Sequence, residues 1–291
     1  MIPSGKVAIV SHDSGGAEIL SSLLNQISDT YILCLDGPAI KIFKRKSITI
    51  QNFNLEEAIE SADWVLTGTS WESNLEYKAI CLARDKGKFV VSFLDHWVNY
   101  KERFTWHGPK VMPNQIWVGD IDAKILAEKT FKDIKIRLIN NPHWKDFQRE
   151  FQLITANNNL INDIHLLYIS SNVDAIKKKK DIVNYTDNDI SNRFLENIYK
   201  VIDKKYLKRI SYRPHPSEKE IETCHFSFDD ITIKIDKNEN LIDSLRLNTH
   251  VVGHNSMALV LSNICGLKTI NIINNLSYDS KIPEKYIDYS I

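Results

Sequence analysis

Short runs of β-branched and apolar residues alternate with longer amphipathic stretches along the chain. In the first half, the runs that predict strands are 6–10, 30–35, 64–67, 88–94, 115–118 and 134–138. Apolar residues recur at helical spacing at 17–26, 55–61 and 72–86, which predicts helices there. Strands that alternate with helices are typical of βαβ units and a parallel sheet.

The same alternation starts again after a polar break at 155–159. Strands are predicted at 164–169, 206–212, 231–235, 250–252 and 269–272, and helices at 192–204, 240–245 and 257–265. Gly266 stands where a glycine commonly ends a helix. We therefore predict an α/β protein of two Rossmann-like domains, 1–150 and 151–291, which face each other across a cleft.

Composition narrows the class of protein. The 291 residues are 43% hydrophobic and 25% charged, the balance of a folded globular chain. Lys plus Arg and Asp plus Glu both total 37, so no net positive charge favours a nucleic-acid partner. No apolar run is long enough to cross a bilayer, no secretory signal is recognisable, and the four cysteines form no CxxC pair. These features predict a cytoplasmic location.

Arg213-Pro214-His215-Pro216, at the end of a predicted strand, is the most informative segment. Two prolines fix the backbone around one guanidinium and one imidazole, which indicates that these side chains must be aimed. Arginine suits phosphate or carboxylate, and histidine can donate a proton near neutral pH. The alternative is a proline-rich turn with a capping histidine.

A second candidate is Gly253-His254-Asn255-Ser256, which leads into an apolar helix. The free N–H groups and positive dipole end of a helix N-terminus bind phosphate. The alternative is an ordinary helix cap, since asparagine and serine are preferred there.

Two further polar loops follow predicted strands of the first half. The loop that contains His12, Asp13, Gly15, Gly16 and Glu18 resembles a glycine-rich phosphate loop, although it has neither GxGxxG nor GK[ST]. The segment Asp95-His96-Trp97 places a carboxylate beside aromatic rings, as a general base beside a sugar-stacking surface would be. Its alternative is a helix cap with a packed tryptophan. The nine histidines show no HExxH and no zinc spacing, so no metal site is predicted.

These features together resemble the bacterial GT-B sialyltransferase and polysialyltransferase families and the related capsule Kdo transferases. The resemblance rests on two Rossmann-like halves, the His215-Pro216 pair and the downstream Asn255-Ser256 helix start. Those families carry an HP motif and a Ser-Ser or Ser-Thr motif that hold the CMP part of a CMP-activated nonulosonic acid. Met257 stands here where a second hydroxyl is usual.

The resemblance implies a GT-B-like fold and a metal-independent glycosyltransferase without a cofactor. A nonulosonic acid of the sialic, pseudaminic, legionaminic or Kdo type would move from a CMP-sugar to a surface glycan. His215 would assist departure of CMP, and Ser256 with its helix would bind the phosphate. The remaining donor-site residues would be Ser170, Ser171, Arg213, Pro216 and Asn255.

The first domain would serve the acceptor. The resemblance implies a carboxylate base there, for which Asp95 is the first choice, followed by Asp13 and Glu18. The acceptor would contact His12, Asp13, Gly15, Gly16, Glu18 and His96. A lipid-linked acceptor would bring the protein to the inner face of the membrane as a peripheral protein. Oligomeric state is left open.

Three alternatives from other classes fit the same organisation. One is a GT-B-like nucleotide-sugar epimerase, which would form product without an acceptor. Another is a capsule or teichoic-acid transferase with a CDP-polyol donor. A third is a non-catalytic nucleotide-binding module, which would bind without turnover.

Overall fold

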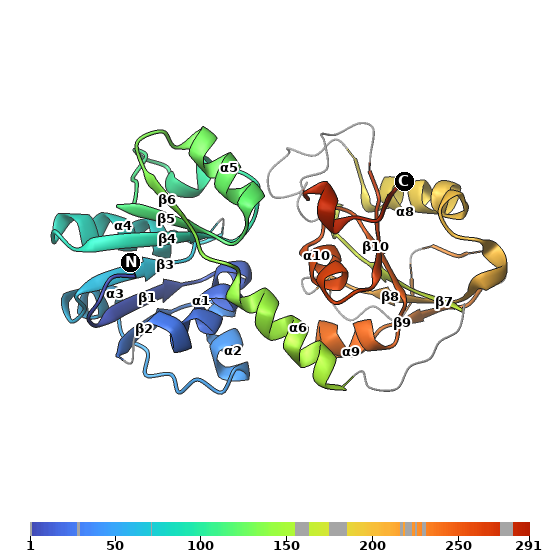
Figure 1. Cartoon of the computed structure of the whole chain (residues 1–291), viewed down its shortest axis with the longest axis horizontal. Coiled ribbons are helices and arrows are strands. Elements are labelled where there is room, and N and C mark those ends of the chain that lie inside the picture. Colours follow the sequence, from blue (N-terminus) through green and yellow to red (C-terminus); the bar gives the residue numbers. More distant parts are fainter. Residues whose placement is uncertain are drawn as a thin grey trace. The chain divides into compact units, whose positions relative to one another are not determined.

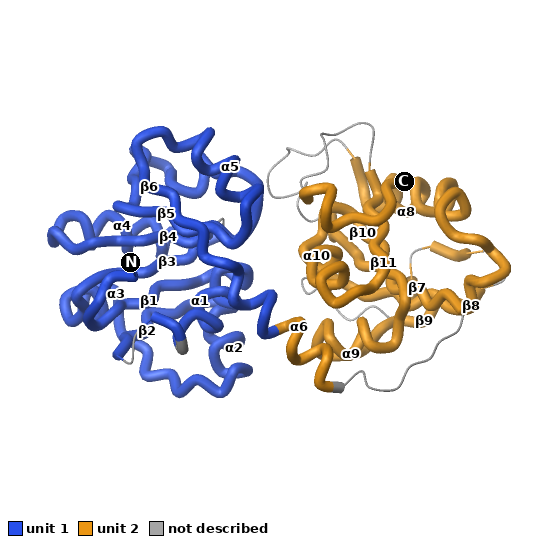
Figure 2. Tube along the Cα trace, in the orientation of Figure 1, with its two compact units in different colours: residues 1–146 blue, residues 147–291 orange. Residues whose placement is uncertain are grey.

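The computed structural model describes residues 2–27, 30–70, 72–154, 163–174, 185–215, 218, 223–224, 226–228, 231–273 and 282–291. The chain divides into two compact units, residues 1–146 and 147–291 (Figure 2). The division falls inside helix α6 (Pro142–Ile154), a few residues before the boundary at 150 expected from the sequence.

Unit 1 is built on a six-stranded parallel sheet in the order β2-β1-β3-β4-β5-β6 (Figure 1). Its strands are β1 (Val7–Ser11), β2 (Tyr31–Leu35), β3 (Trp64–Thr67), β4 (Phe89–Leu94), β5 (Gln115–Val118) and β6 (Lys135–Leu138). Its helices are α1 (Ser14–Ile27), α2 (Pro38–Arg45), α3 (Leu55–Glu60), α4 (Leu75–Asp85) and α5 (Ile121–Thr130). All six predicted strands are confirmed. Continuous β-branched and aromatic runs suit the buried central strands β1, β3, β4 and β5, whereas the edge strand β6 is only partly buried.

Unit 2 repeats this architecture with the order β12-β11-β10-β7-β8-β9, and all its pairings are parallel. The strands are β7 (Ile164–Ile169), β8 (Leu207–Arg213), β9 (Ile233–Ile235), β10 (His250–Gly253), β11 (Lys268–Asn271) and β12 (Tyr289–Ser290). The helices are α8 (Asp187–Asn197), α9 (Leu241–Arg246) and α10 (Met257–Ile264). Gly266 follows α10 with φ +87°, as predicted for a glycine that ends a helix.

Apolar side chains bury one face of α1 against the sheet of unit 1. Leu20 and Leu23 of this helix lie in one core with Ile9, Phe43 and Trp117. In unit 2 the corresponding core is strongly aromatic. The rings of Tyr168 and Tyr212 stack on neighbouring strands with centroids 5.6 Å apart.

Parallel pairing determines where polar loops can gather. In each sheet the carboxyl ends of all strands meet at one edge, and ligands of open α/β sheets bind where the strand order reverses. In unit 1 this switch point lies between β1 and β3, and in unit 2 between β7 and β10. The loops that follow these four strands are therefore the places to look for a site.

Candidate functional site

The loops after β7 and β10 lie next to each other at the switch point of unit 2. Ser170 and Ser171 follow β7, and Asn255 and Ser256 follow β10 after the buried His254. The Ser171 hydroxyl donates a hydrogen bond to the backbone carbonyl oxygen of His254 over 3.1 Å. Four residues expected from the sequence to contact a donor are therefore gathered in one place.

The loop after β10 is held in a defined shape. Asn255 has φ +47°, and its backbone N–H donates to Asn271 Oδ1 over 2.9 Å. His254 is anchored at both ring nitrogens, with Nδ1 2.6 Å from the Ile272 carbonyl oxygen and Nε2 2.7 Å from the Tyr185 hydroxyl. These contacts fix the path of the chain as it enters α10.

Ser256 is the N-cap of α10, which confirms the expected helix start. Its hydroxyl accepts a hydrogen bond from the Ala258 N–H over 3.3 Å. A phosphate at this helix N-terminus would therefore meet a serine hydroxyl that already takes part in capping.

Arg213 lies at the end of β8, beside β7. Its Nη1 donates to Asp236 Oδ2 over 2.8 Å, to Ser244 Oγ over 2.8 Å and to the Asn238 carbonyl oxygen over 3.0 Å. Asp236 is buried, so this ion pair fixes the loop after β9 against α9. A contact between Arg213 and the donor stays a prediction, and the guanidinium would have to share it with these partners.

His215 follows two residues later and is partly buried. Its backbone N–H donates to the Glu218 carboxylate. Burial lowers the pKa of the imidazole, although Glu218 and Asp187 act in the opposite direction. The ring is therefore mostly neutral at pH 7 and can donate one N–H. Pro216 lies outside the described residues.

At the switch point of unit 1, the Asp13 carboxylate is held from two loops. Its Oδ1 accepts from Ser70 Oγ over 2.6 Å and lies 2.8 Å from His12 Nδ1. A Cβ added at Gly16 would lie 3.2 Å from the Gly68 Cα, so α1 begins close to the loop after β3. His12, Asp13 and Gly16 therefore lie together, as expected for residues of one site.

Asp95, the carboxylate predicted first as the base, has a side chain that is 16% exposed and is bound to neighbouring protein groups. Its Oδ1 pairs with the guanidinium of Arg103, whose side chain is 4% exposed. Arg103 also donates to Thr69 Oγ1 over 2.6 Å and to the Val98 carbonyl oxygen over 3.1 Å. A Cβ added at Gly15 would lie only 1.9 Å from Asp95 Oδ2, so both carboxylate oxygens face protein atoms.

The segment after Asp95 does not offer Trp97 to a sugar. The indole is 8% exposed, and its Nε1 donates to Asp120 Oδ1 over 3.2 Å. His96 Nδ1 accepts from the Trp97 N–H over 2.9 Å. The cavity that His96 and Trp144 help to line measures about 10 Å³, enough for about one water molecule. The prediction that Trp97 belongs to a sugar-stacking surface is therefore wrong, because its ring packs inward.

Glu18 belongs to a different cluster. It pairs with Arg45, and its Oε2 lies 3.5 Å from Lys46 Nζ and 3.7 Å from His143 Nδ1. Burial alone would raise the pKa of Glu18, but the neighbouring positive charges lower it. Burial lowers the pKa of His143 to about 4. His143 is therefore neutral at pH 7, and Arg45 and Lys46 balance the Glu18 charge. Contact between Glu18 and an acceptor stays a prediction.

Glu76 is a residue that the sequence did not single out. It stands in the first turn of α4, is 2% exposed, and its Oε1 accepts from the His12 backbone N–H over 2.7 Å. Burial raises the pKa of its carboxyl to about 7, and the charge of Asp13 adds to this effect. An acidic residue in the first turn of a helix is common, so the sequence around Glu76 did not indicate that its side chain is buried.

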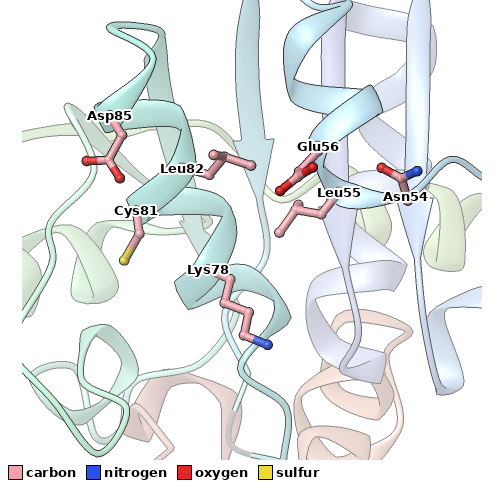
Figure 3. Close-up of a pocket in the computed structure, with 7 residues that line it drawn as sticks. All are labelled: Asn54, Leu55, Glu56, Lys78, Cys81, Leu82 and Asp85. Atoms are coloured by element: carbon pink, nitrogen blue, oxygen red, sulfur yellow. The ribbon is translucent and has the colours of Figure 1, made fainter.

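The described residues contain no group of three or more histidine, cysteine or acidic side chains placed to hold a metal ion. The helices among them include none with the length and apolar character of a membrane span. A surface hollow of about 510 Å³ lies between α3 and α4 and is lined by Asn54, Leu55, Glu56, Lys78, Cys81, Leu82 and Asp85 (Figure 3). None of the predicted site residues lines it.

No protein-family model and no curated protein matches this chain. Among solved structures, MnaA of Staphylococcus aureus with UDP is 10% identical, with a TM-score of 0.61 over 92% of this chain and 79% of that one. The UDP-GlcNAc 2-epimerase of Methanocaldococcus jannaschii is 14% identical, with a TM-score of 0.55 over 91% and 83%. The glycotransferase of kitacinnamycin is 12% identical, with a TM-score of 0.57 over 100% and 87%.

At these identities the likeness shows the fold alone. Nucleotide-sugar epimerases and glycosyltransferases share this two-unit α/β architecture, so the chain has the GT-B fold. The predicted α/β class with two Rossmann-like units is confirmed. The resemblance to sialyltransferases in particular is not confirmed, since these similar structures include proteins named for UDP-sugars.

Replacing Gly15 tests the contact with Asp95. Gly15→Ala should lower the free energy of unfolding by about 1–3 kcal/mol, because the new methyl group meets a carboxylate that Arg103 holds in place. Gly108→Ala is the matched control, expected to stay within about 0.5 kcal/mol, since its nearest atom would be 3.4 Å away. In an Asp95→Ala background the glycine substitution should cost less. If urea unfolding shows that Gly15→Ala lowers the free energy of unfolding equally in the wild type and in Asp95→Ala, the contact between Gly15 and Asp95 is contradicted.

The buried imidazole of His143 makes stability depend on pH. Its folded pKa of about 4 lies below the ordinary value of 6.5, so the unfolded chain binds the extra proton as pH falls. Stability should be full above pH 6.5 and fall by about 3 kcal/mol towards pH 4. His143→Gln should remove this part of the pH dependence in urea unfolding measured from pH 4 to pH 7. An unchanged curve would show that His143 is not buried neutral.

Proposed function

We propose that this chain is a nucleotide-sugar-dependent glycosyltransferase whose donor binds at the carboxyl edge of unit 2. The observation that carries the proposal is the pair of loops after β7 and β10, joined by the hydrogen bond from Ser171 to His254 at the switch point. The GT-B fold supports the class, because the similar structures include glycosyltransferases and nucleotide-sugar epimerases.

The donor phosphate would lie at the N-terminus of α10. The Met257 N–H and the helix dipole there favour a negative charge, and Ser256 borders the same position. Ser170 and Ser171 would contact the nucleotide from the neighbouring strand. His215, two residues after β8, would donate a hydrogen bond to the phosphate as it departs.

The reaction would be a single displacement at the anomeric carbon. The acceptor hydroxyl oxygen forms the new bond, the bond from the anomeric carbon to the phosphate oxygen breaks, and its electron pair leaves with the nucleotide. A carboxylate of unit 1 receives the hydroxyl proton. Asp95 was the first choice for this carboxylate from the sequence, with Asp13 next.

The finer proposal is that the donor is a CMP-activated nonulosonic acid. It is supported by His215 and by the Asn255-Ser256 helix start, the residues that carry the resemblance to CMP-sugar enzymes. No cofactor beyond this donor is proposed, and the acceptor would be a surface glycan. Membrane contact would come only through a lipid-linked acceptor.

The second candidate is a nucleotide-sugar epimerase, which the similar structures favour. An epimerase converts the sugar of its nucleotide-sugar without a second substrate. Incubation of the protein with a nucleotide-sugar alone, followed by analysis of the sugar, separates the two candidates. A new nucleotide-sugar formed without acceptor supports the epimerase, whereas product that depends on an acceptor supports the transferase.

Nucleotide choice is tested by thermal unfolding with CMP, CDP, UMP, UDP and GDP. CMP or CDP should raise the melting temperature most, because a ligand at 100 times its Kd adds about 2.7 kcal/mol of apparent stability. Protection by UDP that equals or exceeds that by CMP would overturn the CMP-sugar proposal. Such a result would support an enzyme that uses a UDP-sugar.

Substitutions in unit 2 test the donor site. His215→Ala should lower kcat by roughly 10²-fold, the lower end for acid assistance, because CMP is a fair leaving group. Ser256→Ala should weaken nucleotide binding by only about 1 kcal/mol, since the helix N–H groups stay. His250→Ala is the matched control, because this histidine lies at the opposite end of β10. Equal losses in His215→Ala and His250→Ala would contradict the assignment.

A further inference from the structure

The Asp13 carboxyl is held in place yet reaches solvent. Its side chain is 23% exposed, and that of His12 is 17% exposed. Ser70 Oγ and His12 Nδ1 both contact the same oxygen, Oδ1. A carboxylate fixed from two loops at a switch point suits a group that must meet a substrate hydroxyl.

Glu76 lies beneath this loop. Its Oε1 accepts the backbone N–H of His12, so the two carboxyls are linked through a single residue. Its Oε2 is buried and has no hydrogen-bond partner among the described residues. Ser11 Oγ, at the end of β1, is likewise buried without a hydrogen-bond partner among the described residues.

The surroundings of Glu76 set its charge. The titratable groups that act on it are His12 and Asp13 from the loop after β1, and it acts in turn on Cys34 of β2. Burial disfavours the charged form, while the His12 N–H and the start of α4 favour it. The carboxyl therefore changes charge near neutral pH, within reach of the Asp13 charge.

We propose that Asp13 and Glu76 form a coupled carboxyl pair in which Asp13 receives the proton of the acceptor hydroxyl and Glu76 is the positioning residue that supports its loop. This inference rests on the proposed transferase function. Asp13 takes the place of Asp95 because the Asp95 carboxylate, although 16% exposed, is paired with the buried Arg103 and packs against Gly15.

The coupling gives Glu76 a definite effect on the reaction. When Glu76 is charged, it binds the His12 N–H more strongly and repels the charge of Asp13. That repulsion is relieved when Asp13 takes the proton, so the charged form of Glu76 favours proton transfer. Turnover should therefore rise with pH through about pH 7.

A substrate-free experiment tests the pair directly. Carboxyl ¹³C NMR of the full chain should place the Glu76 titration near pH 7 in the wild type. In Asp13→Asn the midpoint should fall by roughly half a unit to one unit, because a like charge is removed. An unchanged midpoint would overturn the coupling. Glu128→Gln, an exposed glutamate of α5, is the control and should leave the Glu76 midpoint in place.

Turnover tests the roles within the pair, with CMP-N-acetylneuraminic acid or UDP-N-acetylglucosamine as donor and lactose as acceptor. Asp13→Asn should lower kcat by about 10²–10⁴-fold with KM for the donor unchanged, and Asp95→Asn by less than tenfold. Glu76→Gln keeps an oxygen for the His12 N–H, so it should fold and lose the rise through pH 7. Rates of Asp13→Asn near wild type, with Asp95→Asn inactive, would overturn the assignment.

The two proposals fail in different ways. If the wild-type chain transfers sugar from neither donor while the Glu76 midpoint still falls in Asp13→Asn, the transferase function and the proton-accepting role of Asp13 are overturned. The coupled pair would then stand as a finding by itself. If transfer occurs and Glu76→Gln retains the wild-type pH profile, the role of Glu76 is overturned and the transferase stands.

Discussion

Parallel strand pairing is the constraint on which the candidate sites depend. Since every strand in both sheets runs in the same direction as its neighbours, all polar loops after the strands meet at one edge of each sheet. A reversal in strand order then separates two loops enough to admit a ligand. Residues as distant in sequence as Ser171 and His254 are hydrogen-bonded for this reason alone.

The two switch points have different chemistry. In unit 2 the described loops combine hydroxyl and amide groups with a helix N-terminus, an arrangement suited to a negatively charged ligand. In unit 1 the loops bring together three carboxyl groups. Asp13 contacts His12 and Ser70, Glu76 accepts the His12 N–H, and Asp95 is paired with the buried Arg103. The two units therefore share one architecture but place different chemical groups at their switch points.

Much of the fold could be predicted because buried parallel strands have a strong sequence signature. The strands at 64–67, 115–118 and 164–169 begin and end as predicted. Helix α5 was missed because its buried face consists of Ala123 and Ala127, whereas Ile121 and Ile125 are exposed. Helix α2 was not predicted, although a proline at the first helical position was a usable signal.

The candidate site was predicted less completely than the fold. The sequence predicted Asp13 and Ser171 as site residues because both follow predicted strands. It could not show that Arg103, eight residues after Asp95, folds back to neutralise it. Nor could it show that Glu76 is buried, since burial depends on how the loops after β1 and β3 pack above α4.

The contact between Gly15 and Asp95 also has a consequence for recognising related chains. Gly15 lies in the first turn of α1 and Asp95 follows β4, and the space between them has no room for a Cβ at position 15 beside the Asp95 carboxylate. A relative with a bulkier residue at the first position must therefore have a shorter one at the second. Such a paired change would be the mark of a spatial exclusion, independent of the chemistry that either loop carries out.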